Sequence, residues 1–148
     1  MPLSSAKPEA KATVRITRRL PAPAERVFDA WLDARTLGKW LFATPTGTMV
    51  TVETDARTGG AFRIVERRDG VDVEHTGEYR EIVRPARLVF TFAVPKYSKE
   101  TTRVIIGIVP HTEGCELTLT HEGVLPDYEE RTRQGWGMIL ERLAATLR

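Results

Sequence analysis

The chain ends in a segment whose apolar residues recur with the period of an amphipathic helix. Within residues 127–148, the apolar positions from Trp136 onward are separated by three, one, three, one and three residues. They are Trp136, Ile139, Leu140, Leu143, Ala144 and Leu147. This spacing places them on one helical face and leaves glutamates and arginines on the other. A long helix with one apolar face needs a broad surface to bury it, and we expect a β-sheet to supply that surface.

Much of the preceding chain alternates between apolar and polar residues, which is typical of half-buried strands. Strands are expected at residues 13–20, 49–55, 61–67, 73–83, 88–92, 102–109 and 115–122. After the first strand, Pro21 and Pro23 interrupt the alternation, and apolar residues at helical spacing then predict two short helices, with Asp33 between them as a candidate cap. Because consecutive strands are joined by tight turns, the sequence predicts an antiparallel sheet with helices on one face, an α+β domain.

Two short turns predict which strand residues face the helix. Asp69-Gly70 is a strong two-residue hairpin signal, and a turn there places Ile64 opposite His75 and Phe62 opposite Gly77. A large ring opposite a glycine suits a sheet that bends at that point. A second turn at Glu113-Gly114 places the apolar residues of its two strands on one face, so both hairpins agree on an inner surface.

Composition limits the classes of function and the organisation of the chain. The 148 residues fit one domain, expected at residues 13–148, after a disordered tail at residues 1–12. The net charge of +2 and the scattered basic residues argue against nucleic-acid binding. Cys115 is the only cysteine, so no internal disulfide is possible and a cytoplasmic location is expected. The longest apolar run, residues 104–109, is too short to span a membrane.

Several short motifs in a fixed order resemble a known superfamily. They are PAERVFDAW at residues 23–31, LGKW at 37–40, DARTGGAF at 55–62, GEYREI at 77–82, RLVFTF at 87–92, LTLTH at 117–121 and GW at 135–136. The chain resembles the SRPBCC superfamily of START-like, helix-grip proteins. More narrowly, it is similar to bacterial proteins related to the activator of the heat-shock-protein-90 ATPase. The resemblance covers residues 13–147.

The resemblance implies a fold and a set of possible functions. The fold is a curved antiparallel sheet of six or seven strands wrapped around the long C-terminal helix, with two short helices after the first strand. The function it favours is binding of a small hydrophobic or aromatic ligand between the sheet and that helix. Alternatives within similar folds are a cyclase or aromatase-like enzyme, and a co-chaperone-like module that contacts the heat-shock-protein-90 ATPase. Because one fold serves many functions, the resemblance leaves this choice open.

Ten residues on the expected inner face are the candidates for ligand binding. The apolar candidates are Phe62, Ile64, Phe90, Phe92, Ile106, Leu119 and Trp136, and the polar ones are His75, Tyr79 and His121. A mostly apolar enclosure with a few polar groups is typical of small-ligand sites. The alternative is that the apolar residues simply form the core, and that each histidine is satisfied by a neighbouring carboxylate or backbone group. Glu66 and Glu81 also fall on this face, near strand ends, where we expect them to be solvated.

Other site types have little support in the sequence. No catalytic residue, metal site or cofactor is assigned, because the three histidines lack a tight ligand spacing and no cysteine pair, phosphate loop or nucleophile motif is present.

The expected state is a monomer or weak homodimer, since Val65, Val89, Ile105 and Val109 fall on the outer sheet face. Gly135 and Gly137 flank Trp136 at a cost to helix stability, which suggests a close approach to the sheet or an adjustment to a ligand.

Overall fold

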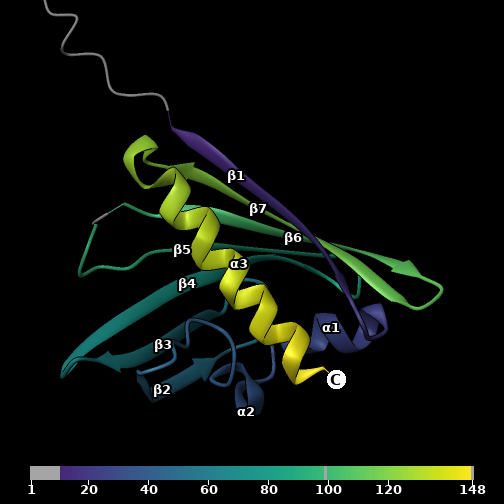
Figure 1. Ribbon diagram of the computed structural model, residues 1–148, viewed down its shortest axis with the longest axis horizontal. Helices are drawn as coiled ribbons and strands as arrows, with labels where there is room; N and C mark the ends of the chain where they lie inside the picture. Colours follow the sequence, from purple (N-terminus) through teal and green to yellow (C-terminus); the bar gives the residue numbers. More distant parts are fainter. Residues whose placement is uncertain (1–10, 99, 148) are drawn as a thin grey trace, which may run out of the picture.

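A seven-stranded antiparallel sheet curves around one long helix (Figure 1). The computed structural model describes residues 11–98 and 100–147. The strands are β1 (Ala12–Leu20), β2 (Thr48–Thr54), β3 (Ala61–Arg68), β4 (Val71–Val83), β5 (Arg87–Phe92), β6 (Thr102–His111) and β7 (Gly114–Val124), in the spatial order β1-β7-β6-β5-β4-β3-β2. The helix α3 (Glu129–Thr146) lies across the concave face. The predicted α+β class and helix-grip arrangement are therefore confirmed.

The first strand begins at Ala12, so most of the predicted tail, residues 1–10, lies outside the described residues.

The two predicted hairpins have the predicted register. At the β3–β4 turn, Asp69 and Gly70 have φ values of 52° and 79°, the left-handed pair that a tight hairpin turn requires. Ile64 pairs with His75 and Phe62 pairs with Gly77. In the β6–β7 hairpin the inner residues also pair as expected, for example Ile106 with Leu119. The alternation of the sequence was sufficient here because a shift by one residue would turn each apolar set to the wrong face.

Gly77 allows β4 to pass closely between its neighbours. A Cβ atom at this position would collide with the carbonyl oxygen of Thr91 and with the ring of Phe62. Just beyond it, the β4–β5 register shifts between Tyr79 and Glu81. The predicted bend opposite Phe62 thus coincides with a site where only a hydrogen atom fits.

The short helices close one end of the sheet. They are α1 (Ala24–Ala30) and α2 (Ala34–Leu37), and the Asp33 side chain caps α2 by accepting a hydrogen bond from the Arg35 amide at 3.0 Å. Trp31 and Trp40 meet edge to face, with ring centroids 4.7 Å apart. Both are at most 2% exposed, as Trp136 is at 3%, so the three tryptophans form core packing.

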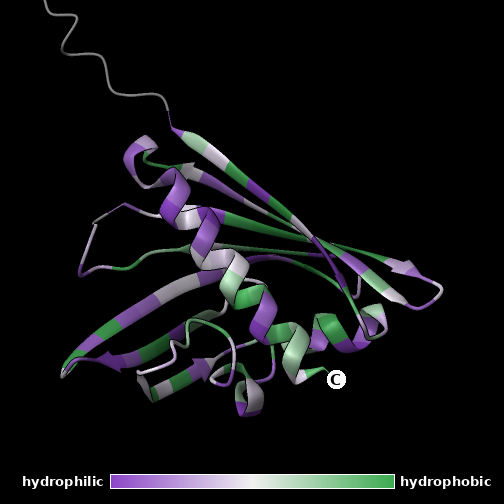
Figure 2. Ribbon diagram, in the orientation of Figure 1, coloured by the Kyte–Doolittle hydropathy of each residue, from purple (hydrophilic) through white to green (hydrophobic). Residues whose placement is uncertain are grey.

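Helix α3 is apolar only in its C-terminal part. Residues Pro126–Tyr128 form a separate 3₁₀ turn, η2, so α3 begins at Glu129 and not at Asp127 as the sequence suggested. Its buried residues are Trp136, Leu140, Leu143 and Ala144. Figure 2 shows that the first turns of α3 are hydrophilic and that the green, apolar positions follow further along. The helix therefore packs against the sheet from Trp136 onward.

The structure contradicts the suggested close approach of Gly135 and Gly137 to the sheet and the expected exposure of two valines on the outer face. A Cβ atom at Gly135 would meet nothing within 4 Å, and one at Gly137 would meet only the end of Arg18 at 3.6 Å, so these glycines mark no close approach to the sheet. Val65 and Val89, although on the outer face, are only 4% and 1% exposed.

Val65 lies between two arginines that pair with acidic residues of the next strand. The flanking arginines of β3, Arg63 and Arg67, form ion pairs with Glu74 and Asp72 of β4. Residues two apart on a strand share a face, so the two arginines flank Val65 on the outer side of the sheet. The outer face therefore offers less exposed apolar surface for self-association than the alternation of the sequence suggested, although Val109 is 58% exposed.

Replacement by alanine should have opposite effects on the free energy of unfolding at Gly77 and at Gly135. We expect Gly77→Ala to lower the free energy of unfolding by about 2–3 kcal/mol, because the added methyl group collides with backbone. In contrast, Gly135→Ala should raise it by about 0.5–1 kcal/mol, because the methyl group meets open space and alanine favours the helix. Urea unfolding of both variants measures these changes, and destabilisation by Gly135→Ala would contradict the structure.

Candidate functional site

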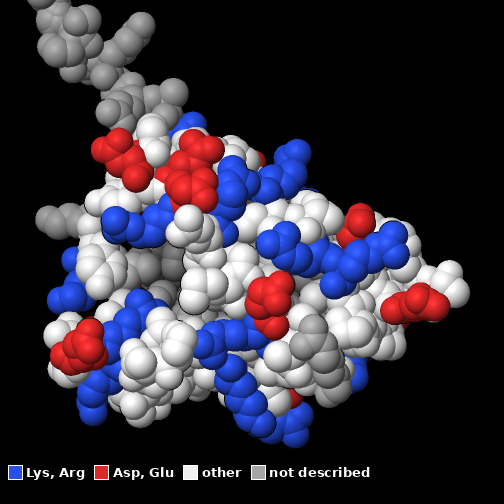
Figure 3. All heavy atoms as spheres, in the orientation of Figure 1, with Lys and Arg blue, Asp and Glu red and all other residues white. Residues whose placement is uncertain are grey.

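The main pocket lies beside the polar first turns of α3. Its volume is about 550 Å³. It is lined by Arg68, Phe92, Ala93, Val94, Tyr97, Ser98, Glu100, Thr102, His121, Gly123, Val124, Leu125, Tyr128, Arg131 and Thr132. Figure 3 shows the surface hollowed between the start of α3 and the strands below it, with Lys and Arg side chains on both sides of the hollow. Pockets of a few hundred cubic ångströms are of the size that binds small molecules.

The pocket exists because the first turns of α3 have no apolar side chain to bury. Residues 129–135, EERTRQG, precede the first apolar residue of the helix, Trp136. On the pocket side these turns present only Arg131 and Thr132, together with Tyr128 of η2. The opposite wall is the segment that joins β5 to β6, which contributes Tyr97 and Glu100. Helix and sheet therefore seal against each other at one end and leave space at the other.

A chain of hydrogen bonds with one direction forms the inner end of the pocket. The Trp136 indole N–H donates to His121 Nδ1 at 3.0 Å. Because an indole nitrogen can only donate, Nδ1 must carry the lone pair and the ring proton must lie on Nε2. That proton is directed at Thr102 Oγ1, 2.7 Å away, and the Thr102 hydroxyl in turn donates to the Phe92 carbonyl at 3.0 Å. The chain joins α3 to β7, β6 and β5.

Burial keeps His121 neutral. The side chain is 5% exposed, and desolvation lowers its pKa from 6.5 to about 4. Protonation of Nδ1 would also replace an accepted hydrogen bond by a repulsive contact with the Trp136 N–H. At neutral pH His121 is thus a fixed polar group at the inner end of the pocket, and it is poorly placed to accept a proton from a substrate.

His75 belongs to an aromatic stack behind the pocket. Its ring lies parallel to that of Phe42, with centroids 4.3 Å apart and planes 4° apart, and Phe42 in turn stacks on Phe92 at 5.0 Å. His75 Nδ1 lies 3.2 Å from the Ile64 carbonyl, which can only accept, so the proton lies on Nδ1. Burial lowers the pKa of His75 to about 4 as well. The stack supports Phe92, which is the aromatic floor of the pocket.

Glu66 is buried, which corrects the expectation that it is solvated. It is 1% exposed, and its carboxylate accepts hydrogen bonds from the Thr44 amide at 2.6 Å, from the Thr44 hydroxyl and from Arg68 Nε. Arg68 also donates to the Phe42 carbonyl at 3.1 Å. The expectation of a solvated Glu66 was wrong because the loop after α2 folds over this end of the strand. Glu81 is solvated, as expected, with its side chain 41% exposed beside Arg87.

The structure brings only part of the predicted ligand-binding set into the pocket. Phe92 and His121 line it. His75 and Trp136 lie directly behind, with ring centroids 6.1 and 6.2 Å from that of Phe92. The other six, Phe62, Ile64, Tyr79, Phe90, Ile106 and Leu119, are at most 5% exposed members of the core and do not line the pocket. The Tyr79 hydroxyl is hydrogen-bonded to that of Thr54 at 2.6 Å.

Most of the lining residues are not among those predicted from the sequence. Arg68, Tyr97, Tyr128 and Arg131 lie in a strand end, a loop and helix turns, where no periodic pattern assigns an inner side. One signal was available: residues 129–135 contain no apolar residue, so a helix over them cannot seal against a sheet. That gap could have predicted the end of the molecule at which the pocket opens.

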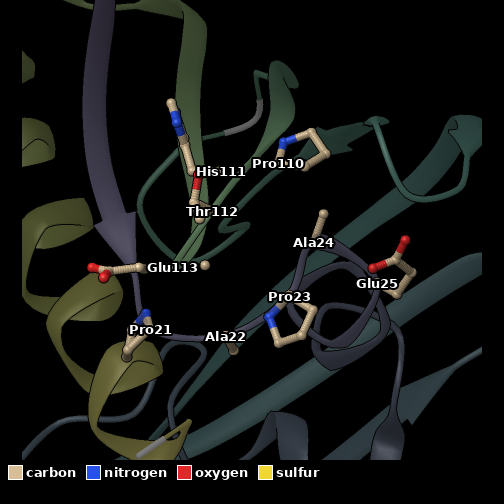
Figure 4. A pocket seen from close by; sticks show the side chains of 10 residues that line it. Pro21, Ala22, Pro23, Ala24, Glu25, Pro110, His111, Thr112 and Glu113 are labelled. Atoms are coloured by element: carbon tan, nitrogen blue, oxygen red, sulfur yellow. The ribbon is translucent and has the colours of Figure 1, made fainter.

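A second, smaller pocket lies at the opposite end of the sheet (Figure 4). Its volume is about 400 Å³, and it lies between the start of α1 and the β6–β7 turn. Its lining residues are Pro21, Ala22, Pro23, Ala24, Glu25, Pro110, His111, Thr112, Glu113 and Gly114. These are mostly short side chains and turn backbone, without an aromatic floor, so this site suits a small ligand less well than the pocket beside α3.

Other kinds of site find little support within residues 11–98 and 100–147. No group of three or more His, Cys, Asp or Glu side chains converges there in a way that could hold a metal ion. None of the helices described is long and apolar enough to cross a membrane. Cys115 is 1% exposed, and burial raises the pKa of its thiol, so it is an unreactive core residue.

The family of the chain follows from its sequence match. Residues 21–148 match the family described as activator of Hsp90 ATPase homolog 1-like protein. The chain belongs to this family. The match spans the two short helices, β2 to β7 and α3, so it includes both walls of the pocket. A comparison with curated proteins finds no match.

Solved structures of similar proteins share the fold. Protein CV1439 from Chromobacterium violaceum is 31% identical, with a TM-score of 0.84 over 91% of this chain and 96% of that one. Protein NE0264 from Nitrosomonas europaea is 22% identical, with a TM-score of 0.76 over 90% and 92% of the two chains. Protein SA2116 from Staphylococcus aureus, described as of unknown function, is 17% identical, with a TM-score of 0.83 over 93% and 94%. At the lower identities the likeness concerns the fold alone.

The buried His121 should make this protein less stable in acid. Its folded pKa of about 4 lies below the ordinary value of 6.5, so the unfolded chain binds a proton first as the pH falls. The free energy of unfolding should therefore drop between about pH 6.5 and 4, by roughly 1 kcal/mol per pH unit from this group. His121→Gln, whose amide can replace both hydrogen bonds, should reduce that slope in urea unfolding measured across this range.

A matched control separates this effect from the loss of any histidine. His111→Gln makes the same replacement at an exposed residue at the end of β6 and removes none of the buried hydrogen bonds of His121. An equal slope in His121→Gln and the unmodified protein would contradict the neutral, buried state of His121.

Proposed function

We propose that this protein binds a small, mostly apolar or aromatic molecule in the pocket beside the first turns of α3. The observation that carries the proposal is the pocket itself, about 550 Å³ in volume, with Phe92 and His121 at its inner end. An aromatic floor with one fixed polar group matches the chemistry of small-ligand sites. Four of the ten residues expected from the sequence contribute to it: Phe92 and His121 line the pocket, and His75 and Trp136 pack against Phe92 from behind.

Two exposed tyrosines at the rim support the same function. Tyr97 is 68% exposed and Tyr128 is 48% exposed, and both line the pocket. Tyrosine rings present a large apolar surface with little loss of conformational entropy on binding. They can close over a bound ring while their hydroxyl groups stay in water. The ligand would enter between the β5–β6 segment and α3.

Two other functions compete with ligand binding. Cyclase or aromatase-like catalysis would use His75, Tyr79 or His121 for proton transfer, but both histidines are neutral and already hydrogen-bonded, and Tyr79 bonds to Thr54. Stimulation of the Hsp90 ATPase is the role that the family description names. It would depend on a protein surface and not on the pocket, so a variant with a filled pocket distinguishes the two.

A tryptophan at Thr132 should fill the pocket and prevent binding. Thr132 lines the pocket from α3, so we expect Thr132→Trp to weaken binding of the neutral dye Nile red by at least about tenfold. Dye fluorescence measures the affinity, and native mass spectrometry of the protein with a panel of aromatic compounds and fatty acids measures the stoichiometry and finds better ligands.

The control places the same side chain on the same helix, away from the pocket. Gln134→Trp alters an exposed residue that does not line it and should bind Nile red as the unmodified protein does. No binding by the unmodified protein, or equal binding by both variants, would refute the proposal. Stimulation of a purified Hsp90 ATPase that survives Thr132→Trp would assign the function to a protein surface instead.

A further inference from the structure

Two arginines from distant parts of the chain line the same pocket. Arg68 is the last residue of β3, and Arg131 lies in the first turns of α3. Among the lining residues within 11–98 and 100–147, they are the only basic side chains. A guanidinium group presents up to five N–H donors in a plane, a geometry that matches a carboxylate. The pocket therefore combines an aromatic interior with cations from two of its walls.

Arg68 is held in place by groups on its inner side. Its Nε–H bonds to the buried carboxylate of Glu66, and one terminal nitrogen donates to the Phe42 carbonyl at 3.1 Å. These two bonds use one part of the guanidinium and fix its plane. The side chain remains 31% exposed, so other N–H donors are available to a ligand. A donor that is already oriented loses less entropy on binding.

Arg131 is a cation that lacks a carboxylate partner among the residues the structure describes. Its guanidinium carbon lies 5.6 Å from the centre of the Tyr128 ring, a cation–π arrangement at the rim. The acidic residues that begin α3 are engaged elsewhere: Glu129 lies 3.6 Å from Arg133, and Glu130 accepts a hydrogen bond from Gln134 at 3.3 Å. They also suit the positive end of the helix dipole.

Glu100 is the single acidic residue among the lining residues that the structure describes, and its charge is compensated from outside the pocket. Glu100 accepts hydrogen bonds from Lys11 Nζ at 2.8 and 3.0 Å, so its charge is balanced by a residue that does not line the pocket. Glu66 balances Arg68 in the same way from behind. Among the described lining residues, what remains is the charge of Arg131, together with the donors of Arg68 that are not used in its bonds to Glu66 and Phe42. The pocket thus favours a ligand with a negative end.

We infer that the pocket selects amphipathic monocarboxylates, with the carboxylate bound by Arg131 and Arg68 and the apolar body extending inward onto Phe92. This inference rests on the proposed function, because it names the class of ligand for the same site. A neutral molecule of equal size would still make the apolar contacts. It would leave Arg131 without an anionic partner and the remaining donors of Arg68 unused.

A pair of probes that differ only in charge tests the inference. Naphthaleneacetate and its uncharged amide, naphthaleneacetamide, carry the same ring and nearly the same shape. By isothermal titration calorimetry, we expect the acid to bind about tenfold more tightly than the amide, the effect of one or two charge-assisted hydrogen bonds in a partly exposed site. This preference should shrink with added salt, whereas the affinity for the amide should not change.

Arg131→Gln should remove the preference for the acid without affecting the amide. We expect the acid to bind about tenfold more weakly to this variant and the amide to bind equally well. The matched control is Arg133→Gln, which makes the same change of charge two residues away, outside the pocket lining, and should change neither affinity more than about twofold. The paired change Glu66→Gln with Arg68→Gln tests the second cation without leaving a buried carboxylate unpaired, and should also weaken only the acid.

The possible results separate the inference from the proposed function. Equal binding of acid and amide, or an equal loss in Arg131→Gln and Arg133→Gln, would overturn the charge selection and leave ligand binding intact. Failure of both probes to bind would overturn both, provided that Nile red and the wider panel also fail to bind. Binding of Nile red with no binding of either probe would overturn the inference alone.

Discussion

The position at which α3 becomes apolar controls the rest of the structure. From Trp136 to the end of the helix, buried residues recur on the sheet side, and burial of each large side chain contributes about 1.5–3 kcal/mol. Before Trp136 the helix has only polar and small residues facing the same sheet. One end of the interface is therefore a core and the other a pocket, although one helix and one sheet form both. The curvature of the sheet, aided by Gly77, keeps the strands beneath both ends.

Polar groups at the boundary between core and pocket hold the two parts together. The chain from Trp136 through His121 and Thr102 to the Phe92 carbonyl joins the helix to three strands, and each donor in it has an acceptor. On the other side, Glu66 ties Arg68 and the loop after α2 to β3. Buried networks of this kind specify one arrangement, because a partly satisfied network costs more than an apolar one. Both networks end on residues that line the pocket.

Membership of the family explains the fold better than it explains the function. The features that place α3 on the sheet fall within the part of the chain that matches the family, and the fold is shared with structures that are only 17–31% identical. The chemistry of the pocket depends instead on a few lining side chains, such as Arg131 and Tyr97. Such residues can change without loss of the fold, so one architecture can serve many ligands or partners.

Local patterns along the chain were sufficient to predict the strands, the hairpin registers and the apolar face of α3. These are local properties: Asp69-Gly70 sets a turn, and alternation then decides that Ile64 faces His75. It also placed Phe92 and His121 on the inner face, where they line the pocket. It could not distinguish them from Ile106 or Leu119, which have the same alternation but lie under the sealed part of the helix.

Where the inner face is open, and which charged side chains reach it, depends on segments that are far apart in the sequence. The burial of Glu66 depends on a loop more than twenty residues away that folds over a strand end. The convergence of Arg68 and Arg131 depends on the crossing of α3 over the sheet. Neither appears in a periodic pattern, because periodicity assigns a side chain to a face and says nothing of what lies across from it. The enclosure that could bind a ligand is a property of two distant segments together.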